Sequence, residues 1–321
     1  MASVQSESNR QSGLQPQIRQ EIKTPAPKRR KINKQKVAPY LFVLPFVIVF
    51  LVFSVYPFVN AIIMSFQRLH GLDDTVFVGL RNYKQLIHDP VFYKVLWNVT
   101  RYTFWTILIL IPLPLVLAVI MNLDSTPYKS FFRSVFFLPV LTSTVIAGIV
   151  FRFAFSREST GVFNTWIGHL GIKPVDWLDS PHTAMFALVV ICVWRWLGVN
   201  MIYFLSGLQS IPKELYECAE IDGASPWVKF KSITLPMVRP ITTYVLTISI
   251  LAGFSLFNES YVYWGASSPD DIGSTFLTYI YKNAFGQGEF GYACTLGVAM
   301  FVIVMIINFI QVTVRGLFKE D

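Results

Sequence analysis

The chain has 321 residues, of which 53% are hydrophobic and only 14% are charged, whereas a soluble protein carries about a quarter charged residues. This composition excludes an ordinary soluble domain and indicates a membrane protein. The formal net charge of +8 comes almost entirely from residues 1–37, and its place beside the first apolar segment favours a juxtamembrane anchor over a nucleic-acid-binding surface.

Residues 1–37 are predicted to form a disordered, basic cytoplasmic tail. They are rich in Gln, Ser, Lys and Pro, have no apolar period, and carry nine Lys/Arg against Glu7 and Glu21. The polar segment before the first apolar run is too long for a secretory signal peptide, and no small-residue cleavage site follows it. Residues 38–321 are predicted to form one transmembrane domain.

Six apolar segments follow, each long enough to cross about 30 Å of hydrocarbon as a helix. Because lipid cannot satisfy free backbone groups, all six are expected to be helical. The predicted fold class is therefore an all-α polytopic membrane protein with six transmembrane helices. The expected spans are 39–66, 98–122, 131–155, 183–208, 241–264 and 292–317.

The placement of Lys and Arg orients these spans. Seventeen Lys and Arg residues fall in the segments on one side of the membrane, and seven fall in the segments on the other side. The side with seventeen holds the tail and the segments 123–133, 209–240 and 315–321. Since cytoplasmic loops carry the excess of positive charge, both termini are expected in the cytoplasm.

The fourth span carries Arg195, the only Lys or Arg well inside a predicted span. An Arg at mid-bilayer costs about 2.5–3.5 kcal/mol, so it should face the bundle or a wet cavity, either in a substrate pathway or bonded to helix carbonyls. Trp196, Asn200 and Tyr203 follow at helical spacing on one face. That face suits sugar rings, and it equally suits a contact between helices.

Residues 209–238 form the longest internal cytoplasmic loop and are predicted to fold as a compact helix–turn–helix. Ser210 is expected to cap the first helix, Gly223 to take the left-handed position after it, and Ser225 to cap a second helix that ends at Leu235. Acidic side chains beside the turn favour a protein partner; the alternative is a helix lying on the bilayer.

The fifth span ends on the outer side with Asn258, Glu259 and Tyr261. These residues are expected either to line an outer vestibule or to sit in the headgroup region.

The loop 209–238 resembles the EAA loop of ABC importer permeases, in the carbohydrate branch that takes up maltose, glycerol phosphate and oligosaccharides. The match includes both gap lengths of that motif, while Cys218 occupies the usual second small-residue position. The matching residues are Glu217, Ala219, Gly223, Ile233, Leu235 and Pro236. The flanks GLRNY at 79–83, FLP at 137–139, GLQSIPKELY at 207–216 and FGYA at 290–293 are similar to the same branch.

The resemblance implies a transmembrane permease subunit of a binding-protein-dependent importer that forms half of the pathway for an oligosaccharide, an acidic one if Arg195 meets a carboxylate. The loop would be the coupling helix–turn–helix between the fourth and fifth helices. Its coupling residues would be Glu217, Cys218, Ala219, Asp222, Gly223, Ile233, Leu235 and Pro236. The substrate-pathway residues would be Arg195, Trp196, Asn200, Tyr203, Asn258, Glu259 and Tyr261.

The implied partners are separate cytoplasmic ATPase subunits that bind ATP and Mg, a second homologous permease, an extracytoplasmic solute-binding protein and the lipid of a prokaryotic inner membrane. The sequence has no phosphate-binding loop and no metal-ligand spacing of Cys and His, so no cofactor, metal or catalytic residue is expected in this chain. The alternatives are a membrane-embedded enzyme and a self-contained secondary transporter or channel, which would need carboxylates inside its spans.

Overall fold

The computed structural model describes residues 34–70, 74–158 and 161–314, so residues 1–33 of the predicted tail lie outside the described residues. The chain divides into two compact units between Ser54 and Val55. The first unit contains helix α1 (Lys34–Phe50), which begins inside the range assigned to the tail and continues as the π-helical turn η1 (Leu51–Val55). Its sequence is apolar from residue 40 onward, as lipid contact requires.

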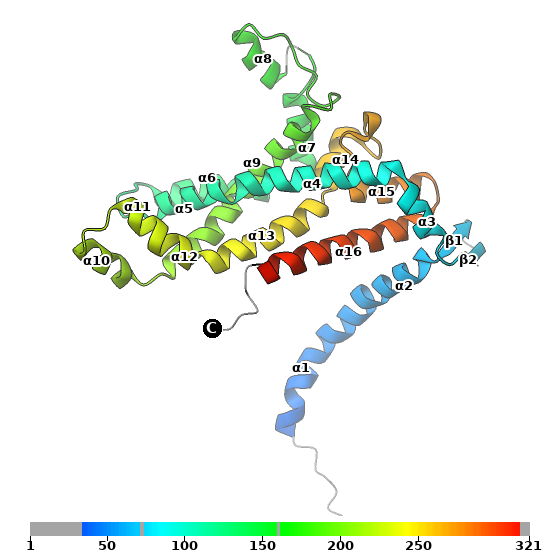
Figure 1. The fold of residues 1–321 in the computed structure, drawn as a ribbon, viewed down its shortest axis with the longest axis horizontal. Helices are drawn as coiled ribbons and strands as arrows, with labels where there is room; N and C mark the ends of the chain where they lie inside the picture. Colours follow the sequence, from blue (N-terminus) through cyan, green and yellow to red (C-terminus); the bar gives the residue numbers. More distant parts are fainter. Residues whose placement is uncertain (1–33, 71–73, 159–160, 315–321) are drawn as a thin grey trace, which may run out of the picture. The chain divides into compact units, whose positions relative to one another are not determined.

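The second unit is a helical bundle that carries one antiparallel β-hairpin (Figure 1). Its first half contains α2 (Tyr56–Ser65), β1 (Gln67–His70), β2 (Asp74–Phe77), α3 (Arg81–His88), α4 (Pro90–Leu110), α5 (Pro112–Asn122), α6 (Lys129–Leu141), α7 (Thr144–Ala154) and α8 (Val162–His169). Its second half contains α9 (Ala184–Gln209), α10 (Lys213–Ile221), α11 (Pro226–Lys229), η2 (Phe230–Thr234), α12 (Leu235–Met237), α13 (Arg239–Phe254), α14 (Asn258–Trp264), η3 (Pro269–Asp271), α15 (Phe276–Tyr281), η4 (Lys282–Gly286) and α16 (Phe290–Val314).

Five helical segments among the described residues are long and apolar enough to cross a membrane, and the bent pair α6–α7 makes a sixth if it is one span. The prediction of a helical membrane protein is confirmed at that level; the hairpin β1–β2 was not predicted. The five segments are Pro39–Ser65, Pro90–Asn122, Ala184–Gln209, Arg239–Trp264 and Phe290–Val314.

Helix α9 lies at the centre of the bundle, where it packs against α4, α5, α6 and α13. Phe204 and Met201 of α9 are fully buried in one apolar cluster with Ala118 of α5 and Val245 of α13. At one end of the bundle lie α10 and α11, and at the other lie α3, α15 and the hairpin, as Figure 1 shows. The two ends are called the α10 end and the α15 end below.

The predicted span 131–155 is not one helix, because α6 and α7 meet at 95°. The chain is extended at Thr142 and Ser143, with ψ near 136° and 132°, and Pro139 has no N–H to bond the preceding turn. Helix α6 also approaches α9 very closely: a Cβ on Gly198 would lie 1.9 Å from the Phe136 carbonyl oxygen. The bend redirects α7 away from the bundle axis (Figure 1).

Two other spans differ from their predicted limits. Helix α4 begins at Pro90 rather than near residue 98, because Asp89 caps it by accepting from the Val91 N–H at 2.9 Å. Arg101 therefore lies three turns inside this helix, so Arg195 is not the only basic residue well within a span. The predicted fifth span 241–264 is broken at 255–257 between α13 and α14.

Candidate functional site

A cavity of about 410 Å³ lies where the break between α13 and α14 faces α4, α7 and α9. Non-helical backbone at membrane depth is tolerated where it lines such a cavity. The wall contains five of the seven predicted pathway residues, namely Arg195, Trp196, Asn200, Asn258 and Glu259. This cavity of about 410 Å³ is called the deep cavity below.

Arg195 and Glu259 place one positive and one negative group on the wall of the deep cavity. One guanidinium N–H of Arg195 donates to the Thr144 hydroxyl at the start of α7, and the guanidinium carbon lies 6.0 Å from the centre of the Trp196 ring. The Nε of Arg195 is buried and has no hydrogen-bond partner among the residues that the structure describes. The cavity therefore offers a donor, an acceptor and an aromatic ring with no net charge.

Asn200 has a structural bond as well as a place in the cavity wall. Its side-chain N–H donates to the Leu110 carbonyl at 3.0 Å, and the residue is only 4% exposed. That carbonyl lacks its usual helical donor, because residue 114, four positions on, is a proline. Asn200 thus joins α9 to the junction of α4 and α5 while its Oδ1 remains an acceptor.

Two predicted pathway residues do not line the deep cavity. The Tyr203 ring packs edge-to-face on Tyr244, with the ring centres 5.4 Å apart, and Tyr261 stacks on Phe257 at 5.1 Å. Sequence reasoning missed Tyr102 and Thr106 of α4, which do line the cavity. Their i, i+4 spacing places two polar groups on one face of α4, and this signal could have identified them.

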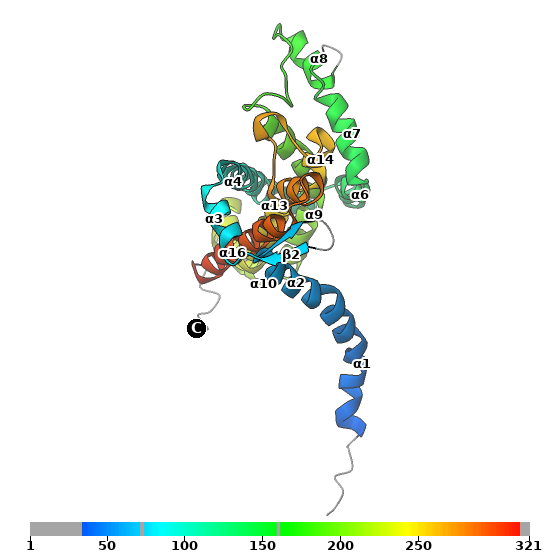
Figure 2. The same cartoon turned by 90° about the vertical axis from the view of Figure 1, so that its right-hand side faces the viewer.

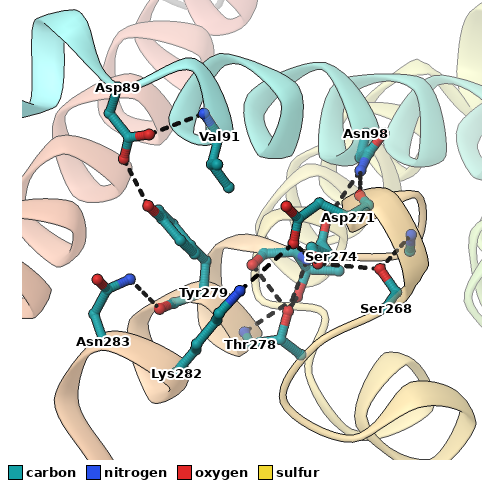
Figure 3. Close-up of polar contacts among 12 residues, drawn as sticks. Asp89, Val91, Asn98, Ser268, Asp271, Ser274, Thr278, Tyr279, Lys282 and Asn283 are labelled. Carbon is teal, nitrogen blue, oxygen red and sulfur yellow. Dashed lines mark hydrogen bonds and ion pairs between the residues drawn. The ribbon is translucent and has the colours of Figure 1, made fainter. Parts of the chain in front are cut away.

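A network of polar contacts at the α15 end holds the segment after α14 against α4 (Figure 3). Asn98 donates to the carbonyls of Asp271 and Ser274 at 2.8 and 3.2 Å. The Asp89 carboxylate accepts from the Tyr279 hydroxyl at 2.6 Å and from the Tyr292 hydroxyl. Burial and this carboxylate raise the pKa of Tyr279 well above its usual value, so the phenol stays protonated and the network intact at neutral pH.

The same segment supports the break that opens the deep cavity. The Thr275 hydroxyl donates to the Leu256 carbonyl at 2.6 Å, and the Ser260 hydroxyl donates to the Gly273 carbonyl at 2.7 Å. The first bond satisfies the backbone carbonyl of Leu256 in the break, and the second joins α14 to the segment that follows it. The positions of Asn258 and Glu259 are thereby fixed by contacts outside the cavity.

The loop 209–238 is a helix–turn–helix at the α10 end, as predicted. Gly223 has φ +71°, and the N–H groups of Gly223 and Ala224 donate to the carbonyls of Glu220 and Ala219, which completes a Schellman cap. The Ser225 hydroxyl accepts from the Val228 N–H at 3.4 Å. The turn is therefore fixed by backbone bonds rather than by contact with the rest of the bundle.

Two details of that loop were predicted wrongly. Ser210 does not cap α10, because its hydroxyl donates back to Gly207 and Pro212 occupies the cap position. The second arm also does not end at Leu235-Pro236 but runs through α12 to Met237. Pro236 follows the π-helical turn η2 directly, and the chain remains helical there.

The two arms of the loop are joined to each other and to the bundle. Tyr216 and Thr234 share a hydrogen bond of 2.9 Å, and the Lys229 ammonium lies 3.5 Å from the Glu220 carboxylate. Ile233 is half-buried and packs against the apolar cluster of α5, α9 and α13. The part of the loop around Ile233 is thus packed against the bundle, so the loop can move with the helices as one body.

The outer surface of the loop combines acidic and apolar groups. Ile221 is 86% exposed and Trp227 is 69% exposed. The predicted coupling residues Glu217, Cys218, Asp222, Gly223 and Leu235 are exposed, while Ala219, Ile233 and Pro236 are half-buried. Large exposed apolar side chains rimmed by carboxylates are typical of a protein-binding surface.

Comparison with known proteins gives concordant matches. Residues 111–317 match the family model described as "binding-protein-dependent transport system inner membrane component". The arabinooligosaccharides transport system permease protein AraP of Bacillus subtilis is 46% identical over 89% of this chain and 91% of its own length. The protein of the same name from Halalkalibacterium halodurans is 43% identical over 90% of each chain.

A solved structure is similar at the level of the fold. It is a chain of a bacterial ABC transporter involved in the import of the acidic polysaccharide alginate, with a TM-score of 0.78 and 24% sequence identity. The match covers 89% of this chain and 98% of that chain.

Proposed function

The chain belongs to the family of binding-protein-dependent transport system inner membrane components, and from this membership we propose that it forms half of the import pathway for a neutral oligosaccharide. It is the permease component of a carbohydrate-uptake ABC importer, and ATP hydrolysis belongs to a separate subunit. The arabinooligosaccharide permeases are the relatives whose substrate class the proposal adopts.

The observation that carries this proposal is the chemistry of the deep cavity. Arg195 supplies donors, Glu259 and the Asn200 Oδ1 supply acceptors, and Trp196 supplies a ring face. A sugar ring is bound by donors, acceptors and an aromatic face together, because its hydroxyls both donate and accept hydrogen bonds and its C–H faces stack on aromatic rings. Since Glu259 balances Arg195, the pair favours a neutral saccharide over an acidic one.

The loop 209–238 is proposed to be the coupling element that docks on the ATPase. A rigid helix–turn–helix with exposed Ile221 and Trp227 and a carboxylate rim supports this role. When the nucleotide-binding subunits close, a loop rooted in the bundle would transmit that movement and switch the cavity between inward and outward access.

The proposed assembly follows from the family. The binding-protein-dependent system implies a solute-binding protein and ATPase partners. We further propose a second homologous permease beside this chain, an ATPase dimer at the α10 end, and delivery of the saccharide at the α15 end. Both termini would then face the cytoplasm, as the distribution of Lys and Arg indicates.

The substrate class is tested with the reconstituted complex and its solute-binding protein. ATP hydrolysis is measured with arabino-oligosaccharides and with uronate oligomers of matched length. The proposal expects stimulation by the neutral series and little by the acidic one. Stimulation by uronates alone would show that Glu259 does not balance Arg195 and that the substrate is acidic.

The docking role is tested by thiol labelling, because Cys218 is exposed whereas Cys192 is buried. A bulky maleimide added to inside-out vesicles should modify Cys218 in the free permease and react slowly when the ATPase is bound. The matched control is Ser125→Cys in a Cys218→Ser background, which places an exposed thiol on the loop 123–128. Equal labelling of Cys218 with and without the ATPase would rule out docking at this surface.

A further inference from the structure

A second recess lies beside the deep cavity, toward the end of α7 and α14. It has a volume of about 480 Å³ and is formed by the last turns of these two helices together with the segments 155–157 and 176–179. The residues that matter here are Arg152, Arg157, Asp176, Asp179, Tyr263 and Trp264. This recess is called the outer cleft below.

The outer cleft carries both signs of charge in equal number. Arg157 and Asp176 lie 3.4 Å apart, and the Arg157 side chain is 80% exposed. Arg152 is exposed and makes one long bond to the Val262 carbonyl at 3.4 Å; Asp179 is exposed as well. The guanidinium and carboxylate groups therefore keep donors and acceptors available in the cleft without a net charge.

An aromatic wall accompanies these groups. The Trp264 indole N–H donates to the Leu178 carbonyl at 2.9 Å, which fixes the orientation of the ring. Tyr263 packs edge-to-face on it, with the ring centres 5.4 Å apart. A fixed aromatic wall beside paired donors and acceptors is suited to a neutral polyhydroxylated ring.

The outer cleft and the deep cavity share two structural elements. Thr144 at the start of α7 and Glu259 at the start of α14 line the deep cavity, whereas the last turns of both helices line the cleft. Helix α14 has seven residues, a length of roughly 10 Å at about 1.5 Å per residue. Helices α7 and α14 lie side by side (Figures 1 and 2), and a Cβ on Gly148 of α7 would lie 2.8 Å from Val262 of α14.

The size of the deep cavity gives a reason for a second site. Its volume of about 410 Å³ lies in the lower part of the range of roughly 300–1,000 Å³ that is usual for small-molecule pockets. A longer oligosaccharide needs contacts beyond such a space. The outer cleft supplies the same kinds of groups one short helix away.

We propose that the outer cleft is a saccharide subsite that holds the trailing end of an oligosaccharide whose leading end occupies the deep cavity. This inference rests on the proposed saccharide import. It assigns to Arg152, Asp179 and Trp264 a preference for chain length, while Arg195 and Glu259 of the deep cavity hold the first sugar units.

The test compares uptake of a disaccharide and a tetrasaccharide of the arabino series by the reconstituted complex with its solute-binding protein. Asp179→Asn and Arg152→Gln are each expected to lower the ratio of tetrasaccharide to disaccharide uptake about tenfold, as the loss of one hydrogen bond to a charged group predicts. Lys173→Gln is the matched control, because Lys173 is exposed and does not line the cleft. Its ratio should equal that of the wild type.

Each other result has a definite meaning. An unchanged ratio in both cleft variants overturns the subsite. An equal loss for both saccharides, together with weaker binding of the solute-binding protein, also overturns it and assigns the cleft to protein docking. Failure of the proposed function itself is distinguishable, because then the wild-type complex would import neither saccharide.

Discussion

The turn at Gly223 gives the sharpest test of the coupling loop. Gly223 has φ +71° and a Cβ built on it would meet nothing within 4 Å, so a substitution there adds backbone strain but no internal clash. That strain is about 1–2 kcal/mol, against a typical folding stability of about 5–15 kcal/mol. Gly223→Asp should therefore insert and fold, yet it places new bulk and charge at the tip of an exposed turn.

The expected outcome is loss of ATP-dependent uptake with normal amounts of permease in the membrane. Uptake and copurification of the ATPase are measured side by side for Gly223→Asp, Gly223→Asn and Gly223→Ala. Asn tolerates the left-handed conformation and is uncharged, so the Asn variant separates bulk from charge, and Ala reports strain with the least bulk. Normal uptake in Gly223→Asp would refute the reasoning about this turn.

Three further predictions concern stability. Asn200→Leu should cost about 1–3 kcal/mol, because the Leu110 carbonyl is left without a donor, and thermal unfolding of the purified protein should show a lower Tm. Gly198→Ala should lower the Tm strongly, since the Cβ has no room, whereas Gly168→Ala, which meets nothing within 4 Å, should not. Asp89→Asn keeps a good helix cap, so the expected loss of about 1–3 kcal/mol in the free energy of unfolding should report the hydrogen bonds that Asp89 accepts from Tyr279 and Tyr292. An unchanged Tm would contradict the role of these bonds.

Local signals in the sequence predicted much of this molecule. The positions of the apolar segments, the left-handed Gly223 and the Ser225 cap each depend on a few neighbouring residues. For the same reason the start of α4 was predictable, because Asp89-Pro90 is a cap followed by a first-turn proline. The family resemblance, carried by the loop 209–238, is confirmed by the family model and by the relatives.

Features that depend on packing were not predictable in the same way. Pro114 shows in the sequence that the Leu110 carbonyl is free, but nothing local identifies Asn200 as its donor. The predicted face of α9 is also divided in the structure: Trp196 and Asn200 line the deep cavity, while Tyr203 packs on Tyr244. The side of a helix that faces a cavity is set by its neighbours, and these lie far away in the chain.

The central claim is that this chain imports a saccharide only when a separate ATPase drives it. The most direct measurement is the accumulation of a labelled arabino-oligosaccharide in proteoliposomes that hold the complete complex, with the solute-binding protein outside and ATP inside. The account predicts accumulation that stops when ATP or the solute-binding protein is left out. Accumulation by this chain alone, without ATP, would contradict it.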